Sequence, residues 1–339
     1  YLDWAMTQGL GILGTTTFDR CYIGTSDVPP QPTDTTFVGT QLAMSASSVL
    51  VKDSVPPSNR IELIKSFPNI GVGNVNQLAV TPDNEILLVG NSNANPTLKA
   101  FKIDKSDWSL TELVVPAFDI FDRELGAAVG LSCGGDYLFV GLNYAPWGKL
   151  FRRNGNNFEF VADTPELSFS VRDSDISPGG NYLIACSYDS LYHTRVVLYE
   201  IIDNSIVVLT TAANIYNVKA VGFSPSGERY FVASGPDGTA SGAKGYLDIY
   251  KREGQTYSLE FRYSQTNPYG MVGSAAFISD NSLVVLDGYG ITTSYYLRRL
   301  EYNMDTGNWD VTLSVSQGVS GDKVDCFAGK YILLSGSRA

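Results

Sequence analysis

The chain has 339 residues, with 35 acidic and 24 basic side chains, a formal net charge of −11 and a single histidine. A hydrophobic share of 44% and an aromatic share of 12% exclude a disordered protein. The scattered basic residues give no patch for nucleic acid, and the apolar runs fall far short of the roughly 20 residues that a membrane helix takes.

Residues 1–46 form the first predicted region, an arm that does not share the pattern of the rest. A strand-like segment, 18–26, ends in small residues and leads into a stretch with Pro29, Pro30 and Pro32. These prolines favour polyproline II and block regular strand pairing. We therefore expect an arm laid across a neighbouring protein, the alternative being a coil that packs on the base of the main domain.

This arm resembles a motif of minor structural proteins of tailed bacteriophages. In that motif an apolar strand ends in small residues, and a proline-rich piece then runs into an Asp-Thr-x-Leu-like sequence; Ile23-Gly24-Thr25, Asp34-Thr35 and Gln41-Leu42 match it, whereas Phe37 departs from it. The resemblance implies a virion protein, in a symmetric multimer with other virion structural proteins. The residues expected at this assembly interface are Val28, Pro29, Pro30, Pro32, Asp34, Thr35, Phe37 and Leu42.

Next along the chain, residues 48–52 and 60–65 are predicted to form a hairpin. Both segments are rich in apolar residues, and Pro56 and Pro57 separate them. The hairpin has the character of the third and fourth strands of the repeat described below, but no first and second strand precede it.

From about residue 75 the chain repeats one pattern six times: an apolar strand, a turn with Pro, Gly or Asn, and a second, very apolar strand. The first copy is Leu78–Asn84 followed by Glu85–Gly90, and the last is Val324–Gly329 followed by Lys330–Leu334. The residues that close the turns are Asn84, Gly135, Gly180, Gly227, Asn281 and Gly329, which lie 45 to 54 residues apart. Gly and Asn take positive φ at low cost, and a period near 45 residues with four short strands is typical of a β-propeller blade.

A second hairpin with alternating polar and apolar residues follows each of the first five copies and completes four strands per blade. These hairpins are expected at Leu98–Ile103 with Ser109–Val114, Lys149–Arg152 with Phe158–Val161, Arg195–Ile201 with Ser205–Thr210, Tyr246–Lys251 with Ser258–Tyr263, and Tyr296–Tyr302 with Asp310–Val315. The sixth copy has no such hairpin after it. We expect the hairpin at 48–65 to complete that blade.

The prediction is thus an all-β, six-bladed β-propeller over residues 47–339, closed by N-terminal strands that complete the last blade, with the proline-rich arm over 1–46. Closure would remove the free sheet edges that invite aggregation. A seven-bladed ring would need strands from residues 1–45. The turn-plus-strand motif Ser-Pro-x-Gly-x-Tyr-Leu resembles bacterial WD-like propeller repeats, which implies the fold and hardly any function.

Catalytic and metal-binding motifs are scarce in this sequence. His193 is the only histidine for a Ser-His-Asp arrangement, and it lies in a predicted loop between the second and third strands of a blade. Asp173 and Asp175 share one strand face, as solvated or hydrogen-bonded acids or, alternatively, as ligands of calcium. The four cysteines, expected as buried free thiols rather than a zinc site, are Cys21, Cys133, Cys186 and Cys326. We therefore predict a non-enzymatic protein without metal or cofactor.

Aromatic residues gather in the loops that a propeller presents on one face. Tyr and Trp among small polar residues give rigid contact area with adaptable hydrogen bonds, which predicts a face that binds glycan or protein. The alternative is that these aromatics cap the blade ends. The predicted ligand-binding residues are Tyr144, Trp147, Tyr188, Tyr192, Tyr269, Tyr289 and Tyr295, and Phe118 and Phe121 belong to the same loops.

Together these features predict a structural protein of a bacteriophage particle, tail- or fibre-associated, whose propeller binds protein or a host surface glycan during attachment. A capsid decoration protein is one alternative. A bacterial extracytoplasmic propeller, either a binding module or a hydrolase, is the other, and it predicts a metal or paired acids in the central channel. Neither nucleic acid nor a membrane is expected as a partner.

Overall fold

The computed structural model describes residues 74–92, 98–118, 128–142, 145–167, 169–188, 193–236, 244–264, 270–289, 295–317, 323–327 and 331–335. Regular structure in this part of the chain is β-strand, apart from one 3-10 turn, η2 (Pro116–Phe118). None of its helical segments has the length and apolar character to cross a membrane. The protein is therefore all-β in the described part, as predicted.

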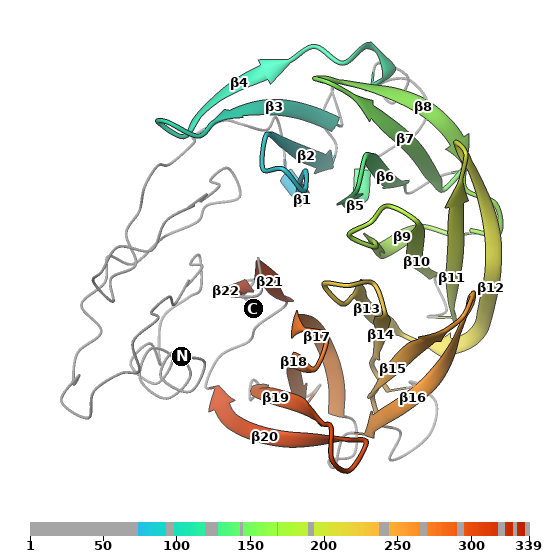
Figure 1. Cartoon of the computed structure of the whole chain (residues 1–339), viewed down its shortest axis with the longest axis vertical. Coiled ribbons are helices and arrows are strands. Elements are labelled where there is room, and N and C mark those ends of the chain that lie inside the picture. Colours follow the sequence, from blue (N-terminus) through green and yellow to red (C-terminus); the bar gives the residue numbers. More distant parts are fainter. Residues whose placement is uncertain are drawn as a thin grey trace. The chain divides into compact units, whose positions relative to one another are not determined.

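Five four-stranded antiparallel sheets follow one another along the chain (Figure 1). In each sheet the strands pair in chain order. The first contains β1 (Asn74–Val80), β2 (Ile86–Ser92), β3 (Leu98–Asp104) and β4 (Ser109–Leu113). The second contains β5 (Ala128–Gly134), β6 (Tyr137–Leu142), β7 (Gly148–Asn154) and β8 (Asn157–Asp163), and the third β9 (Val171–Ile176), β10 (Tyr182–Tyr188), β11 (His193–Ile202) and β12 (Ser205–Tyr216).

The remaining strands continue the same order. The fourth sheet contains β13 (Val218–Phe223), β14 (Arg229–Ser234), β15 (Tyr246–Glu253) and β16 (Thr256–Ser264), and the fifth β17 (Gly270–Ser279), β18 (Ser282–Tyr289), β19 (Tyr295–Asn303) and β20 (Asn308–Gln317). A two-stranded sheet of β21 (Lys323–Phe327) and β22 (Tyr331–Ser335) follows. All five predicted four-stranded units and the sixth strand pair are thus confirmed.

The turn residues of the repeat mostly take the backbone conformation expected of them. Positive φ values of 58°, 54°, 75° and 75° occur at Asn84, Gly135, Gly180 and Gly227. Asn281 does not adopt this conformation; there the register of β17 and β18 shifts between Phe277 and Ser279. Gly329 lies outside the described residues. The prediction that Gly or Asn closes each turn with a positive φ is therefore confirmed at four of the turns that the structure describes.

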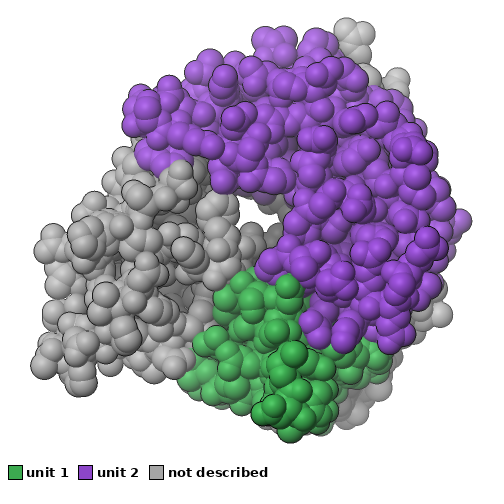
Figure 2. Space-filling view, viewed as in Figure 1, with its two compact units in different colours: residues 1–67, 233–249, 259–339 green, residues 68–232, 250–258 purple. Residues whose placement is uncertain are grey.

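The chain forms two compact units, coloured in Figure 2: unit 2 covers Pro68–Val232 and Tyr250–Ser258, and unit 1 includes Ala233–Ile249 and Leu259–Ala339. Within unit 2 the first strands of successive sheets, β1, β5, β9 and β13, lie side by side, and β4, β8 and β12 lie away from them (Figure 1). Within unit 1, β17 and β21 are neighbours in the same way. Consecutive propeller blades have this arrangement. The hairpin at 48–65 and the arm at 1–46 lie outside the described residues, so neither the six-bladed count nor the closure is confirmed.

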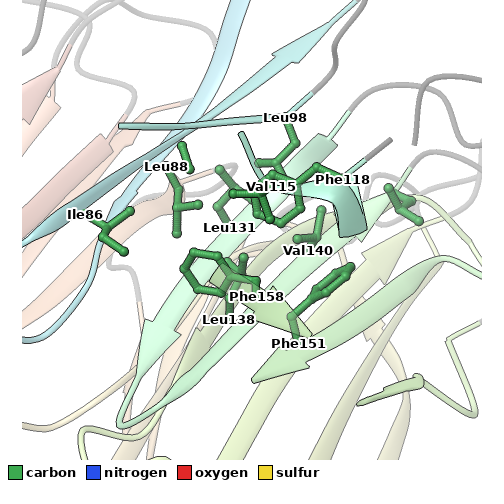
Figure 3. Close-up of a cluster of buried hydrophobic side chains, with 12 residues drawn as sticks. Ile86, Leu88, Leu98, Val115, Phe118, Leu131, Leu138, Val140, Phe151 and Phe158 are labelled. Atoms are coloured by element: carbon green, nitrogen blue, oxygen red, sulfur yellow. The ribbon is translucent and has the colours of Figure 1, made fainter. Parts of the chain in front are cut away.

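The core of unit 2 is packed between neighbouring sheets. The cluster in Figure 3 combines Ile86 and Leu88 of the first sheet with Leu138 and Phe151 of the second, all fully buried. The second strand of each blade is covered on both faces, which explains why Ile86–Val89 is continuously apolar instead of alternating.

Phe118 belongs to this core rather than to a loop face. It lies in η2 with 5% of its surface exposed, stacks on Phe158 at 5.6 Å between ring centroids, and meets Phe151 edge-on at 5.9 Å. The prediction that Phe118 contributes to an aromatic binding face is therefore wrong, because the connection between the first two blades folds back onto their shared core. Phe121 lies outside the described residues.

The outermost strand of three blades carries a β-bulge at a corresponding place. The extra residues are Val161 in β8, Leu209 in β12 and Thr312 in β20. A bulge bends the strand and increases its twist, and such distortion discourages a free edge from pairing with another chain. The outer edges are therefore unfavourable templates for strand addition.

Replacing Gly134 with alanine should lower the free energy of unfolding by about 1–3 kcal/mol, the usual effect of overpacking. A Cβ atom at Gly134 would lie 2.4 Å from the carbonyl oxygen of Ser177 and 2.5 Å from Cγ2 of Ile176, and a backbone oxygen cannot rotate away. At Gly179 the nearest atom to such a Cβ is 3.4 Å away, so Gly179→Ala should change stability by at most about 0.5 kcal/mol. Chemical denaturation compares the two; equal losses would contradict the packing argument.

Candidate functional site

The innermost strands carry a β-bulge at one shared position of the repeat. In each of these strands one residue has no partner in the pairing with the second strand of the blade. These bulge residues are Asn76 in β1, Val129 in β5, Arg172 in β9 and Gly273 in β17. Lys219 occupies the same position in β13, because Val218–Pro225 aligns with Val171–Pro178 without a gap. Bulges re-aim side chains and are frequent beside active sites. A functional site on the inner strands is therefore expected at this position.

Two carboxylates hold β9 and β13 side by side. Oδ2 of Asp173 accepts a hydrogen bond from the backbone N–H of Val221 at 3.0 Å, and Oδ2 of Asp175 accepts one from Phe223 at 2.7 Å. Among the described strands, the inner edge of β13 has no further strand to pair with, so its N–H groups need acceptors from elsewhere. The acids of one blade thus satisfy the inner edge of the next.

The sequence prediction for this Asp-Ser-Asp motif is confirmed in its hydrogen-bonded form. Both acids lie on one strand face, as their spacing indicated, and both bind backbone N–H groups. Among the described residues, no group of three or more His, Cys, Asp or Glu side chains is placed to hold a metal ion. The geometry therefore gives these acids a role in joining blades.

Arg172 and Lys219 bring two positive charges together at the bulge position of neighbouring inner strands. Both side chains are half-buried. Burial and repulsion by the Arg172 guanidinium lower the pKa of Lys219 to about 8, because both disfavour the charged ammonium. Lys219 makes no ion pair or hydrogen bond within the described ranges. A desolvated lysine beside an arginine favours a negatively charged group at this place.

Sequence reasoning missed both basic residues. The available signal was their shared position, each six residues before the proline of a Ser-Pro turn. Two isolated basic residues in different repeats carry no motif, and only the packing of β9 against β13 makes them a pair.

Unit 1 contains a second group of buried charges, at the ends of four strands. Asp248 of β15 pairs with Arg262 of β16 through two contacts of 2.6 and 2.7 Å, and the guanidinium lies over the ring of Tyr246, 4.4 Å from its centroid. The Asp248 side chain is 1% exposed and that of Arg262 50%. The pair therefore neutralises a buried acid at the surface end of a sheet.

Asp287 of β18 forms the other half of this group. Its fully buried carboxylate accepts hydrogen bonds from Nε of Arg298 at 2.7 Å and from the hydroxyl of Tyr263 at 2.5 Å. Burial, together with the nearby negative charge of Asp287, raises the pKa of Tyr263. The phenol therefore stays protonated and donates its hydrogen bond. Tyr263, Asp287 and Arg298 thus connect β16, β18 and β19 by side-chain hydrogen bonds.

The predicted aromatic residues are only partly within the described chain. Trp147 is half-buried, takes a positive φ of 70°, and packs against the core between the second and third sheets. Tyr188 ends β10, Tyr289 ends β18 and Tyr295 begins β19, so these three flank the connections between second and third strands. Tyr144, Tyr192 and Tyr269 lie outside the described residues. Ligand binding by this set stays a prediction.

The other candidate residues fall at different places. His193 is the first residue of β11, which corrects the prediction of a loop position. Cys133 and Cys186 are free thiols as predicted, although Cys133 is only partly buried. The predicted assembly interface, residues 28–42, lies outside the described chain, as does Cys21.

No protein-family model and no curated protein matches this sequence. Among solved structures, a proposed 6-phosphogluconolactonase from Bacteroides uniformis matches over 80% of this chain and 79% of its own, with a TM-score of 0.58 and 13% identity. The periplasmic gluconolactonase of Pseudomonas aeruginosa matches over 74% of both chains, with a TM-score of 0.51 and 16% identity. The Cps50 (Swd1) β-propeller domain of Myceliophteria thermophila matches over 78% of this chain and 84% of its own, with a TM-score of 0.51 and 10% identity.

These similarities correct one prediction and leave another without support. The prediction that the protein is not an enzyme is contradicted, because two similar propellers are named for lactone hydrolysis; a missing Ser-His-Asp arrangement does not exclude such chemistry. None of the proteins compared above is a phage component, so the virion role, its partners and its localisation gain no support. The chain is therefore an all-β protein with the β-propeller fold, similar to both WD-like and lactonase propellers.

Proposed function

We propose that the protein is a bacterial extracytoplasmic propeller that hydrolyses a lactone of a small sugar acid at the inner strands of unit 2. The observation that carries this proposal is the pair Arg172 and Lys219 at the bulge position of adjacent inner strands. The similar lactonase propellers supply the reaction class, and the similar periplasmic protein supplies the compartment.

The proposed chemistry uses the two cations as electrostatic stabilisers. Water adds to the lactone carbonyl, the ring C–O bond breaks, and the product carries a carboxylate and a hydroxyl group while one proton is released. Negative charge develops on the carbonyl oxygen in the transition state. Positive groups already fixed near that oxygen lower the barrier without reorganisation. Arg172 and Lys219 are placed for this role at corresponding positions of the neighbouring inner strands β9 and β13.

Lys219→Met should lower kcat/KM for a hydrolysed lactone about 100- to 1,000-fold, the usual effect of losing one oxyanion donor. The measurement is proton release by the full chain with glucono-δ-lactone and related sugar lactones, above the spontaneous rate. Lys102→Met, at an exposed position of β3, is the matched control and should keep full activity. Failure of the wild-type chain to accelerate any lactone in the panel would overturn the proposal.

The same mechanism fixes the sign of the pH dependence. Only protonated Lys219 is charged. We therefore expect kcat/KM to fall as the pH rises through about 8, which is the pKa of the Lys219 side chain in the protein without substrate. The charged residues on the strands packed against it are Arg172, Asp173 and Asp175 of β9 and Arg229 of β14. Lys219→Arg should move this loss to higher pH, because arginine keeps its charge.

A further inference from the structure

The turn that joins β7 to β8 contains the single Asn-Gly pair of this sequence, Asn154-Gly155. Asn154 pairs with Asn157 at the end of the two strands, so only Gly155 and Asn156 lie between them. All four residues are exposed. A Cβ atom built at Gly155 would meet nothing within 4 Å. The turn is therefore open to water and lacks the packing that surrounds the strands.

The side-chain amide of Asn154 and the backbone nitrogen of Gly155 are neighbours that can react with each other. Attack of this nitrogen on Cγ of Asn154 is intramolecular, so no second molecule has to be brought into place. Gly155 has no Cβ atom to obstruct the approach. Its N–H lies outside the strand pairing and donates no hydrogen bond to a residue that the structure describes. Both reacting groups are thus accessible in the folded hairpin.

We propose that Asn154 is a site of spontaneous deamidation, a modification that is independent of lactone hydrolysis. The Gly155 nitrogen forms a bond to Cγ of Asn154 and gives up its proton, the bond from Cγ to Nδ2 breaks, and ammonia leaves. Water then opens the succinimide ring. Cleavage of the new bond to Cγ gives aspartate, whereas cleavage of the original peptide bond gives isoaspartate, whose main chain runs through the side-chain carboxyl group. Water is the only co-reactant.

Another turn of the protein shows that an acid fits at this place. The corresponding turn of the fourth sheet, between β15 and β16, contains Glu253-Gly254. Gly254 takes a φ of 67°, close to the 63° of Gly155. In both turns the arginine that precedes the pair donates from Nε to the glycine carbonyl, Arg153 at 2.8 Å and Arg252 at 2.9 Å. We therefore expect the aspartate product to retain the turn.

The isoaspartate product should disturb the turn more strongly. It lengthens the main chain inside a hairpin whose loop length sets the strand register. Arg153, the preceding residue, forms ion pairs with Asp83 and Glu85 of the first sheet. Both products also lose the hydrogen bond from Nδ2 of Asn154 to Glu159, which is 2.8 Å long. Isoaspartate is therefore expected to weaken the junction of the first two sheets more than aspartate does.

The test is incubation of the folded full chain at neutral and at mildly alkaline pH, followed by peptide mass spectrometry that separates asparagine, aspartate and isoaspartate. Asn156 and Asn157 are the internal controls, because they are exposed in the same turn and are followed by residues with side chains. Asn154 should deamidate at least about 10-fold faster than either, which corresponds to about 1.4 kcal/mol in the barrier. The rate should rise with pH, because the deprotonated nitrogen is the better nucleophile.

Asn154→Gln is the matched variant, since a longer side chain would have to close a larger ring. Deamidation at this position should be lost in the variant, and circular dichroism checks that it is folded. Equal rates at Asn154, Asn156 and Asn157 would overturn the proposal. So would an Asn154 that stays intact in the folded chain but deamidates in urea, because the turn would then protect the amide. Lactone hydrolysis enters neither result, so the proposed function is tested separately.

Discussion

Asp287→Ala should lower the free energy of unfolding by about 3–5 kcal/mol, the usual cost of removing one partner of a buried ion pair. The substitution leaves the Arg298 guanidinium, 19% exposed, without its acid and removes the acceptor of the Tyr263 hydroxyl. The Arg298 guanidinium and the Tyr263 hydroxyl would remain shielded from water and would each lose a hydrogen-bond acceptor. The free-energy cost of leaving such buried groups unsatisfied is larger than the net contribution of the hydrogen bonds themselves. The measurement is urea denaturation followed by fluorescence.

Two further variants make this prediction specific. Asp310→Ala removes an exposed acid from β20 of the same sheet and should change stability by at most about 0.5 kcal/mol. Asp287→Leu combined with Arg298→Met replaces the ion pair by apolar groups and should recover most of the loss, because no buried charge is left unpaired. A double variant as unstable as Asp287→Ala would show that the charge imbalance is not the cause.

The double variant Asp173→Ala, Asp175→Ala should lower the free energy of unfolding by about 3–6 kcal/mol, from two hydrogen bonds to charged acceptors at about 1.5–3 kcal/mol each. These carboxylates supply acceptors to the inner edge of β13, whose Val221 and Phe223 N–H groups would otherwise lack them. Hydrogen exchange of those two amides is the direct readout, and both should lose protection.

The amide variants of the same positions are the matched control. Asp173→Asn combined with Asp175→Asn keeps a carbonyl acceptor at each place and removes only the charge. This pair should cost less than half as much as the alanine pair, because a neutral hydrogen bond contributes about 1 kcal/mol. Equal losses in both double variants would mean that the N–H contacts are not what stabilises the junction.

The strand pattern was predictable because it depends on local chemistry. Very apolar second strands such as Ile86–Val89 are buried on both faces, and residues such as Gly180 and Gly227 take the positive φ that closes a tight turn. These requirements act within about ten residues of chain. A repeating sequence therefore displays them in every blade without reference to the rest of the fold.

The candidate site was not predictable in the same way. Attention to loop aromatics placed Phe118 on a binding face, whereas packing against Phe151 and Phe158 buries it. The single histidine suggested a lack of catalytic equipment, yet similar propellers named for lactone hydrolysis contradict that conclusion. A deficit of one residue type excludes one mechanism, and electrostatic catalysis needs only charges in the right place.

By itself, the sequence determined an all-β chain of repeated four-stranded units and the turns that close them. Strand burial and positive φ in a turn depend on the residue types at neighbouring positions, which the sequence contains directly. Only the tertiary structure decided that Asp173 and Asp175 satisfy the edge of β13 and that Arg172 and Lys219 lie on neighbouring inner strands. These contacts join residues of different blades. Their chemistry appears only when β9 and β13 pack side by side and leave an inner edge that needs acceptors.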